Sequence, residues 1–299
     1  MKRFLIDICL GLIVFCITWI LAEYTMAHVD IQNDYSYKYN YVNGNPAIKT
    51  LLIGHSHFEN SINPYLMGDS VFDFAISGRW IYYDASLAKE IFPTMPNLRV
   101  VIIPLGYHNI YSSWHYNAPR DIDKEYAFMY SKFMHTYYDR FPEYVYFSSA
   151  LCCNKLGIKY WRNEQVDSLG YGEIVGQEEN WGNVHNVPSD MLTKKYANES
   201  HAEYRQYLIQ IARICYENNI RFIAVTCPCA NCYIENTNEE GMNNLYALID
   251  SVRTYYPIEY KNYLDDAEFR ADSLYYNSSH LNSIGADKFA IRVKEDFGL

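Results

Sequence analysis

Two segments far apart in the chain constrain its fold more than any other feature. Ser56 lies in LLIGHSHFENSINP (residues 51–64), and His280 lies in YYNSSHLNSIGADKF (residues 275–289). A serine hydroxyl is a poor nucleophile unless a base within hydrogen-bond reach accepts its proton. If these two residues act together, the fold must bring the segments side by side, and hydrolysis or acyl transfer becomes the leading hypothesis.

The residues before Ser56 predict a strand that ends in a sharp turn. Residues 48–53 form a short, mostly apolar, β-prone run, and Gly54 lets the backbone turn without steric cost. In an open α/β sheet ligands bind beyond the carboxyl ends of the strands, where a following helix directs free N–H groups at an anion. Ser56 is therefore placed to attack, and its own N–H could help to hold an oxyanion. Taken alone, such a Gly-x-Ser turn is more often structural.

The surroundings of His280 strengthen the catalytic interpretation. The residue follows a polar Asn-Ser-Ser stretch, and apolar residues at helical spacing come after Gly285. We therefore expect His280 in a loop at the boundary of an element, where a rigid scaffold commonly positions catalytic residues.

The motifs resemble those of a known family. Gly54-His55-Ser56-His57 and His280-Leu281-Asn282-Ser283-Ile284-Gly285-Ala286 resemble blocks I and V of the SGNH (GDSL-type) hydrolases, in a membrane-anchored branch of bacterial envelope proteins. Residues 71–84 (VFDFAISGRWIYYD) are similar to block II, whose glycine N–H donates to the oxyanion, and Gly78 matches it. The resemblance covers residues 47–299. It implies a three-layer α/β/α sandwich with a flavodoxin-like, five-stranded parallel sheet.

The sequence departs from the family at the residue that orients the histidine. Family members usually carry an aspartate three residues before it, and this chain has Asn277. An amide does not stabilise imidazolium as a carboxylate does, and the equivalent exchange in a serine protease costs about 10⁴ in turnover. Three alternatives stay open: a backbone carbonyl orients His280 in a Ser-His dyad, Asp272 or Asp265 substitutes, or catalysis is weak or lost.

The third block departs as well. The family motif is Gly-x-Asn-Asp, with an asparagine that donates to the oxyanion, whereas residues 106–109 read Gly-Tyr-His-Asn. Asn109 is one position late and His108 occupies the matching place, so either residue is a candidate donor. His55 and His57 are expected to line the pocket, with His57 packing under the nucleophile turn. No carboxylate or third histidine lies at local ligand spacing, so we expect neither a metal nor a cofactor.

The segment before the domain indicates a membrane anchor. Lys2 and Arg3 precede an uncharged apolar run, residues 8–22, and residues 4–7 extend it to about the 20 residues that a spanning helix needs. Positive charge before the span keeps that side in the cytoplasm, so the later residues are expected outside it, in the periplasm if the cell has two membranes. A cleaved signal peptide with a site at Thr25-Met26-Ala27 is the alternative.

Three regions follow from these assignments: an anchor at residues 1–27, a polar linker at 28–46 that acts as a tether, and the domain at 47–299. Within the domain strands are expected over residues 100–105 and 221–226 and near 263–264, and helices over 80–91, about 204–215, 239–255 and after 282. Residues of about 110–198 fit this alternation poorly. We interpret them as an insertion that caps the active-site face.

Composition excludes some partners. The formal net charge is −10 without a basic cluster, which excludes nucleic acid as a partner. The 31 tyrosines suit sugar faces, although most tyrosines simply pack. Cys227, Cys229 and Cys232 could form a redox pair or half of a zinc site with Cys152 and Cys153, but a structural disulfide is the commoner outcome in an exported chain.

The sequence as a whole therefore predicts an anchored, extracytoplasmic esterase or O-acyltransferase that acts on acyl groups, acetyl by expectation, of an envelope or surface polysaccharide. The alternative is a catalytically weak or inactive protein of the same fold that binds glycan or assists envelope polysaccharide assembly.

Overall fold

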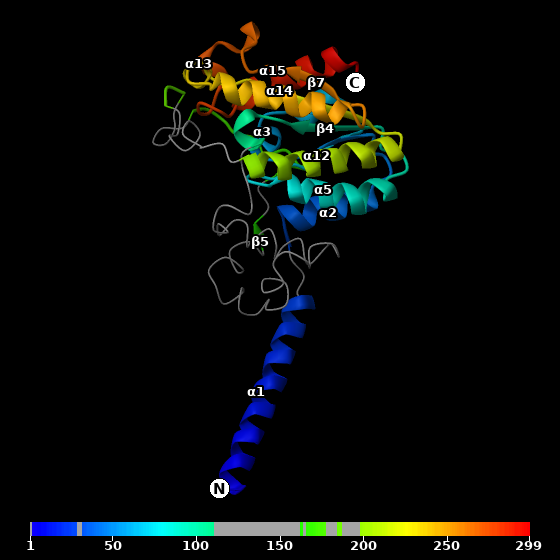
Figure 1. The fold of residues 1–299 in the computed structure, drawn as a ribbon, viewed down its shortest axis with the longest axis vertical. Helices are drawn as coiled ribbons and strands as arrows, with labels where there is room; N and C mark the ends of the chain where they lie inside the picture. The colour runs from blue at the N-terminus through cyan, green and yellow to red at the C-terminus, as the bar shows by residue number, and fades with distance from the viewer. Residues whose placement is uncertain (1, 29–31, 111–161, 164–165, 178–183, 187–197) are drawn as a thin grey trace. The chain divides into compact units, whose positions relative to one another are not determined.

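The structure is a computed structural model that describes residues 2–28, 32–110, 162–163, 166–177, 184–186 and 198–299 (Figure 1). Most of the expected insertion, residues 110–198, lies outside the described residues. The chain divides into two compact units, one made of residues 1–37 and 119–164 and the other of residues 38–118 and 165–299.

In the part of the first unit that the structure describes there are a long helix and a short strand pair. Helix α1 covers Lys2–His28, and its stretch Lys2–Thr25 is long and apolar enough to cross a membrane or to act as a signal anchor. Strand β1 (Gln32–Asn33) pairs in parallel with β5 (Arg162–Asn163). The N-terminal apolar helix expected from the sequence is thus confirmed.

The second unit is built on a five-stranded parallel sheet. Its strands are β3 (Val71–Asp73), β2 (Thr50–Leu52), β4 (Val100–Pro104), β6 (Arg221–Thr226) and β7 (Glu259–Asn262), in that spatial order. In sequence order this is 2-1-3-4-5, the flavodoxin-like arrangement, whose switch point lies between the first and third strands. The expected α/β class and sheet are confirmed.

Helices cover both faces of this sheet. Helix α12 (Asn198–Glu217) packs against α5 (Ile81–Ile91) and α14 (Glu239–Arg253), while α15 (Ser283–Phe297) packs against α4 (Pro64–Met67) (Figure 1). Right-handed crossovers place these two groups on opposite faces. Under α15 the core is continuous, with fully buried Leu52, Ile102, Ile223, Phe289 and Val293. The turn that carries Ser56 and the loop that carries His280 are therefore both supported by a packed core.

The last strand was placed wrongly from the sequence. We expected it near residues 263–264, but β7 ends at Asn262, and Tyr263 follows it with its N–H donating to Thr226 O at 2.9 Å. Strand β7 is an edge strand with the sequence Glu-Tyr-Lys-Asn, so it lacks the apolar run that marks a central strand.

The segment expected to act as a tether contains a helix. Helix α2 covers Asp34–Gly44, the Lys38 side chain is fully buried, and the Tyr41 ring stacks on Phe72 with centroids 4.4 Å apart. A polar segment reads as solvated from its sequence alone, and here aromatic packing and a buried lysine outweigh its polar composition.

Candidate active site

Gly54 makes the turn that presents Ser56. The chain leaves β2 with φ of +114° at Gly54, and a Cβ there would lie 2.5 Å from Pro104 Cδ. The Gly54 N–H donates to Asp84 Oδ1 at 3.0 Å, and helix α3 (Ser56–Glu59) begins two residues later. Only glycine satisfies both the backbone angle and the close approach of β4.

Replacing Gly54 by alanine is therefore expected to destabilise the protein by about 2 to 4 kcal/mol, because backbone strain and overpacking add. Gly68→Ala is the matched control, since Gly68 has φ of +140° but open space around its Cα. Urea unfolding of both variants separates the two costs. Equal destabilisation would show that the Pro104 contact contributes nothing.

The two residues singled out from the sequence meet. His280 Nε2 lies 2.8 Å from Ser56 Oγ, across 224 positions of sequence. A tight loop holds the histidine: the Tyr276 N–H donates to His280 O at 2.9 Å, and the Ala230 N–H donates to Ser278 O at 2.9 Å. Asn282 caps α15 directly after this loop, with its side chain accepting from Gly285 N–H. The imidazole thus sits on a fixed backbone.

Asn277 contacts the other nitrogen of the imidazole. Its Oδ1 lies 3.1 Å from His280 Nδ1 and accepts the backbone N–H groups of Ser279 at 3.1 Å and His280 at 3.0 Å. Ser279 Oγ is also 3.1 Å from Nδ1. An amide oxygen accepts, so this geometry favours the tautomer with a proton on Nδ1 and a free lone pair on Nε2 facing Ser56.

The carboxylates considered as substitutes have other neighbours. Asp272 lies 3.9 Å from Nδ1 of the exposed His185, and Asp265 forms an ion pair with Arg270. Among the described residues, the groups within hydrogen-bond distance of Nδ1 are Asn277 Oδ1 and Ser279 Oγ, and neither a backbone carbonyl nor either aspartate is one of them.

The two histidines that flank Ser56 pack around the site. The buried His57 ring stacks on His280 with centroids 4.7 Å apart and an interplanar angle of 28°. The His55 ring meets His57 edge-on at 4.9 Å, and its Nδ1 accepts the His57 N–H at 3.5 Å as the cap of α3. The expected packing of His57 under the nucleophile turn stays a prediction.

Burial keeps the imidazoles of His280 and His55 neutral near pH 7. It lowers the pKa of His280 to about 4 and that of His55 to about 3, the latter also through the positive charge of His280 and Arg79. Near pH 7 His280 is therefore unprotonated and able to accept a proton from Ser56.

The same shift predicts acid sensitivity. An unfolded histidine titrates near 6.5, so between pH 6.5 and about 4 the unfolded chain binds a proton that folded His280 does not. Its contribution, about 1 to 3 kcal/mol, is fully present above pH 6.5 and is lost as pH falls to 4. Urea midpoints of the wild type and His280→Gln at pH 7 and 4.5 measure it. An equally steep loss in the variant would contradict this source.

Gly78 occupies a turn suited to an oxyanion donor. Arg79 N–H donates to Ile76 O at 3.0 Å, and Gly78 has φ of +76°, as the third position of a type II turn requires. Within the described chain neither the Ser56 N–H nor the Gly78 N–H donates to a protein acceptor. Both remain available for a substrate oxygen.

The structure does not identify the oxyanion donor among the residues of the third block. Asn109 lies in α6 (Tyr107–Ile110), where its Oδ1 accepts Gly106 N–H at 3.2 Å. The side chain of His108 lies outside the described part of the structure. The choice between Asn109 and His108 as a donor stays a prediction.

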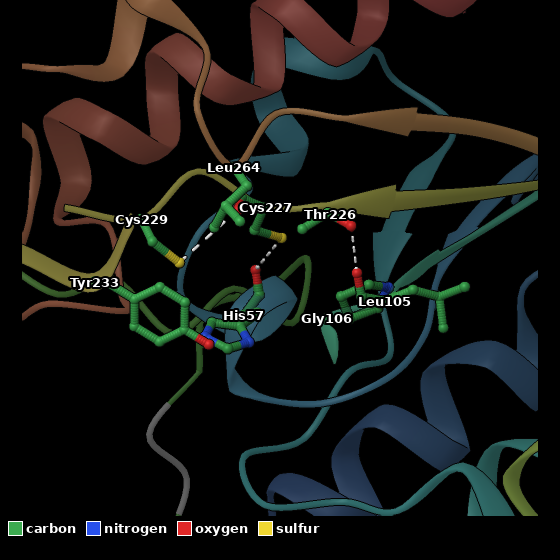
Figure 2. Close-up of a pocket in the computed structure, with 9 residues that line it drawn as sticks. His57, Leu105, Gly106, Thr226, Cys227, Cys229, Tyr233 and Leu264 are labelled. Atoms are coloured by element: carbon green, nitrogen blue, oxygen red, sulfur yellow. Dashed lines mark hydrogen bonds between the residues drawn. The ribbon is translucent and has the colours of Figure 1, made fainter. Parts of the chain in front are cut away.

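A small cavity lies beside His57, at the carboxyl ends of β4 and β6 (Figure 2). Leu105, Thr226, Cys227, Cys229, Tyr233 and Leu264 contribute to its lining. Cys227, which directly follows β6, donates through Sγ to His57 O at 3.5 Å. The end of β6 therefore also supports the segment that carries Ser56.

The cysteines do not form the expected disulfide. Cys227, Cys229 and Cys232 carry free thiols, and each points to a different backbone oxygen. Burial raises the pKa of all three, which disfavours the thiolate that redox chemistry requires. Among the described residues no three His, Cys, Asp or Glu side chains gather as a metal site. Cys152 and Cys153 lie outside the described residues.

Sequence reasoning missed four charged residues beneath the site: Lys38, Glu59, Arg79 and Asp84. They form two buried ion pairs, of which Lys38–Glu59 measures 3.3 Å and Arg79–Asp84 measures 2.7 Å. A charged residue in a polar sequence context gives no sign of burial. The one available signal was that Glu59, Arg79 and Asp84 lie within or beside the first two motifs.

No family model matches the chain, and no curated protein matches it. The solved structures that resemble it include two bacterial proteins. One is a protein from Bacteroides fragilis NCTC 9343 provisionally named as an acylhydrolase, with 11% identity, a TM-score of 0.43, and 84% of this chain and 86% of that chain covered. The other, from Streptococcus pneumonia, is provisionally named as a platelet activating factor, with 11% identity, a TM-score of 0.44, and coverage of 97% and 98%. At this level of likeness neither protein's activity transfers to this chain.

Proposed function

We propose that this protein is an SGNH-type serine esterase or O-acyltransferase. The observation that carries the proposal is the 2.8 Å contact between Ser56 Oγ and His280 Nε2, with the Nδ1 side held by Asn277. A nucleophile, a base and a group that orients the base form the arrangement that nucleophilic catalysis requires.

The first half-reaction follows from these positions. His280 Nε2 takes the proton as Ser56 Oγ bonds to the acyl carbon, and the carbonyl π electrons move to oxygen. The Ser56 and Gly78 N–H groups are the proposed donors to that oxyanion. When it collapses, the bond to the leaving alkoxide breaks, and the imidazolium returns its proton to the alcohol. An acyl-serine remains.

The second half-reaction decides between hydrolase and transferase. Water or a sugar hydroxyl gives its proton to His280 Nε2 as its oxygen bonds to the acyl carbon. The bond from that carbon to Ser56 Oγ then breaks, and the imidazolium returns the proton to Oγ, which restores the free serine. A carboxylic acid leaves in the first case and a new ester in the second. Asn277 holds the imidazole but carries no charge, so we expect a slow enzyme.

We further propose that the site faces the outside of the cell and acts on acyl groups, acetyl by preference, of an envelope or surface polysaccharide. Helix α1 supports the anchor, and Lys2 and Arg3 before it support a cytoplasmic N-terminal side. The glycan substrate and a link to polysaccharide machinery rest on the resemblance of the motifs.

Full-length protein in detergent tests the proposal. We expect release of the aryl alcohol from an aryl acetate, labelling of Ser56 by a fluorophosphonate, and release of acetate from an O-acetylated polysaccharide. Added oligosaccharide acceptor that gains acetyl groups would identify a transferase. The absence of both turnover and labelling would refute the proposal that the protein is an enzyme.

A non-catalytic glycan-binding or assembly protein is the second candidate. Asn277 at the usual aspartate position and the engagement of Asn109 with Gly106 favour it. Glycan binding that persists in a protein without turnover or Ser56 labelling would support this candidate.

A further inference from the structure

We propose that the two buried ion pairs beneath the site are positioning residues for the oxyanion donor Gly78. This inference rests on the proposed function, because it assigns a role in the same reaction. The pairs are Lys38 with Glu59 and Arg79 with Asp84. Each connects one side of the Gly78 turn to one side of the nucleophile turn.

Glu59 makes the first connection. It lies three residues after Ser56 in α3, and its Oε2 accepts the N–H of Ser77 at 2.7 Å as well as the Ser77 hydroxyl. Its Oε1 lies 3.3 Å from Lys38 Nζ, and the side chains are 9% and 0% exposed. Lys38 also donates to Ala75 O. The residue before Gly78 is therefore fixed to the helix that carries Ser56.

Asp84 makes the second connection. Its Oδ1 accepts Gly54 N–H at 3.0 Å and lies 2.7 Å from Arg79 Nη2. Gly54 lies two residues before Ser56, and Arg79 directly follows Gly78. Both side chains are at most 3% exposed. The residue after Gly78 is therefore fixed to the turn that precedes Ser56.

Together the pairs hold the two donors, the Ser56 N–H and the Gly78 N–H, from both sides. Stability alone does not explain them, because apolar replacements of a buried ion pair are often neutral or stabilising. A displacement of 1 Å in a catalytic group can cost about 10²-fold in rate. The ion pairs and their hydrogen bonds are directional, so they can fix the spacing between two backbone donors. Apolar packing is less directional and would fix that spacing less well.

The chemistry also explains why Lys38 is buried. It comes from α2, outside the three motifs, and its ammonium group lies 3.3 Å from Oε1 of the carboxyl group whose other oxygen accepts two hydrogen bonds from Ser77. Helix α2 thereby becomes part of the active domain.

Glu59→Gln in the full-length protein tests the inference. The amide keeps its shape but loses the charge, so we expect kcat for an aryl acetate to fall about 10- to 100-fold, with KM within about threefold. The acid limb of the pH profile should not move, since His280 is unchanged. The fluorophosphonate labelling rate should fall in parallel, because that adduct places an oxygen among the same donors. If the pair had a purely structural role, the variant would be less stable but its kcat and its labelling rate would be unchanged.

Two further variants keep the test decisive. The double variant Lys38→Met/Glu59→Gln removes both charges of the pair, so no unpaired charge stays buried and we expect it to fold. Its kcat should match that of Glu59→Gln alone. Asp296→Asn is the matched control, because Asp296 pairs with Lys261 and Arg292 away from the site; it should lower thermal stability without changing kcat. A folded Glu59→Gln or double variant with wild-type kcat would overturn the inference alone. A wild type without turnover would overturn the proposed function, and this inference with it.

Discussion

Replacing Ser56 by alanine is expected to abolish turnover of an aryl acetate and labelling by a fluorophosphonate. The hydroxyl that His280 contacts at 2.8 Å is the only proposed nucleophile, so the rate should fall at least about 10²-fold, to background. The loss is smaller than in a complete triad because Asn277 already limits the wild type. Turnover and mass spectrometry of the labelled peptide measure both effects.

Ser61→Ala is the matched control for this change. Ser61 lies five residues further along the same segment, and its buried hydroxyl has no partner in the described part of the chain. Its removal should therefore leave both activity and stability close to wild type. If Ser56→Ala and Ser61→Ala retain equal activity, the hydrolysis does not proceed through Ser56.

Replacing Asn277 by aspartate is expected to increase kcat about 10- to 10³-fold. The Oδ1 position already accepts from two backbone N–H groups and lies beside His280 Nδ1, so a carboxylate fits without rearrangement. Its negative charge would stabilise the imidazolium formed during attack. The gain stays below the 10⁴ known for the reverse exchange, since the imidazole is already oriented.

The pH dependence of kcat is a second test of the Asn277→Asp variant. In the wild type the acid limb should fall near 4, where burial places the pKa of His280. A neighbouring carboxylate raises that pKa, so the limb should move to roughly 6 to 7. Asn238→Asp adds the same charge at the cap of α14, where the side chain only accepts from Gly241, and should change neither reading. An unchanged limb with Asn277→Asp would show that this position does not govern His280.

Much of the site could be predicted because its residues lie in short, ordered patterns. A β-prone run ending at Gly54 indicated the place of Ser56, and a polar stretch before a predicted helix indicated that of His280. Both depend on local backbone preferences, which a sequence displays directly. The partner of His280 Nδ1 was not accessible in the same way, since it depends on which side chain a loop turns inward.

The buried charges and the edge strand show where sequence reasoning fails. Lys38 and Glu59 are 21 positions apart, and only the packed structure brings them together in an environment without water. Strand β7 was misplaced because pairing with a single neighbour does not demand an apolar run. In both cases tertiary contacts decide what composition does not show.

The separation of Ser56 and His280 along the chain has a consequence for the timing of activity. Strands β3, β4, β6 and β7 lie between them in the chain and must join the sheet before α15 can dock and carry the imidazole into place, and such non-local assembly is slow. A partly synthesised or half-folded chain then exposes a serine with ordinary alcohol reactivity, harmless to esters around it. Recovery of hydrolysis after denaturation would consequently report the completion of folding.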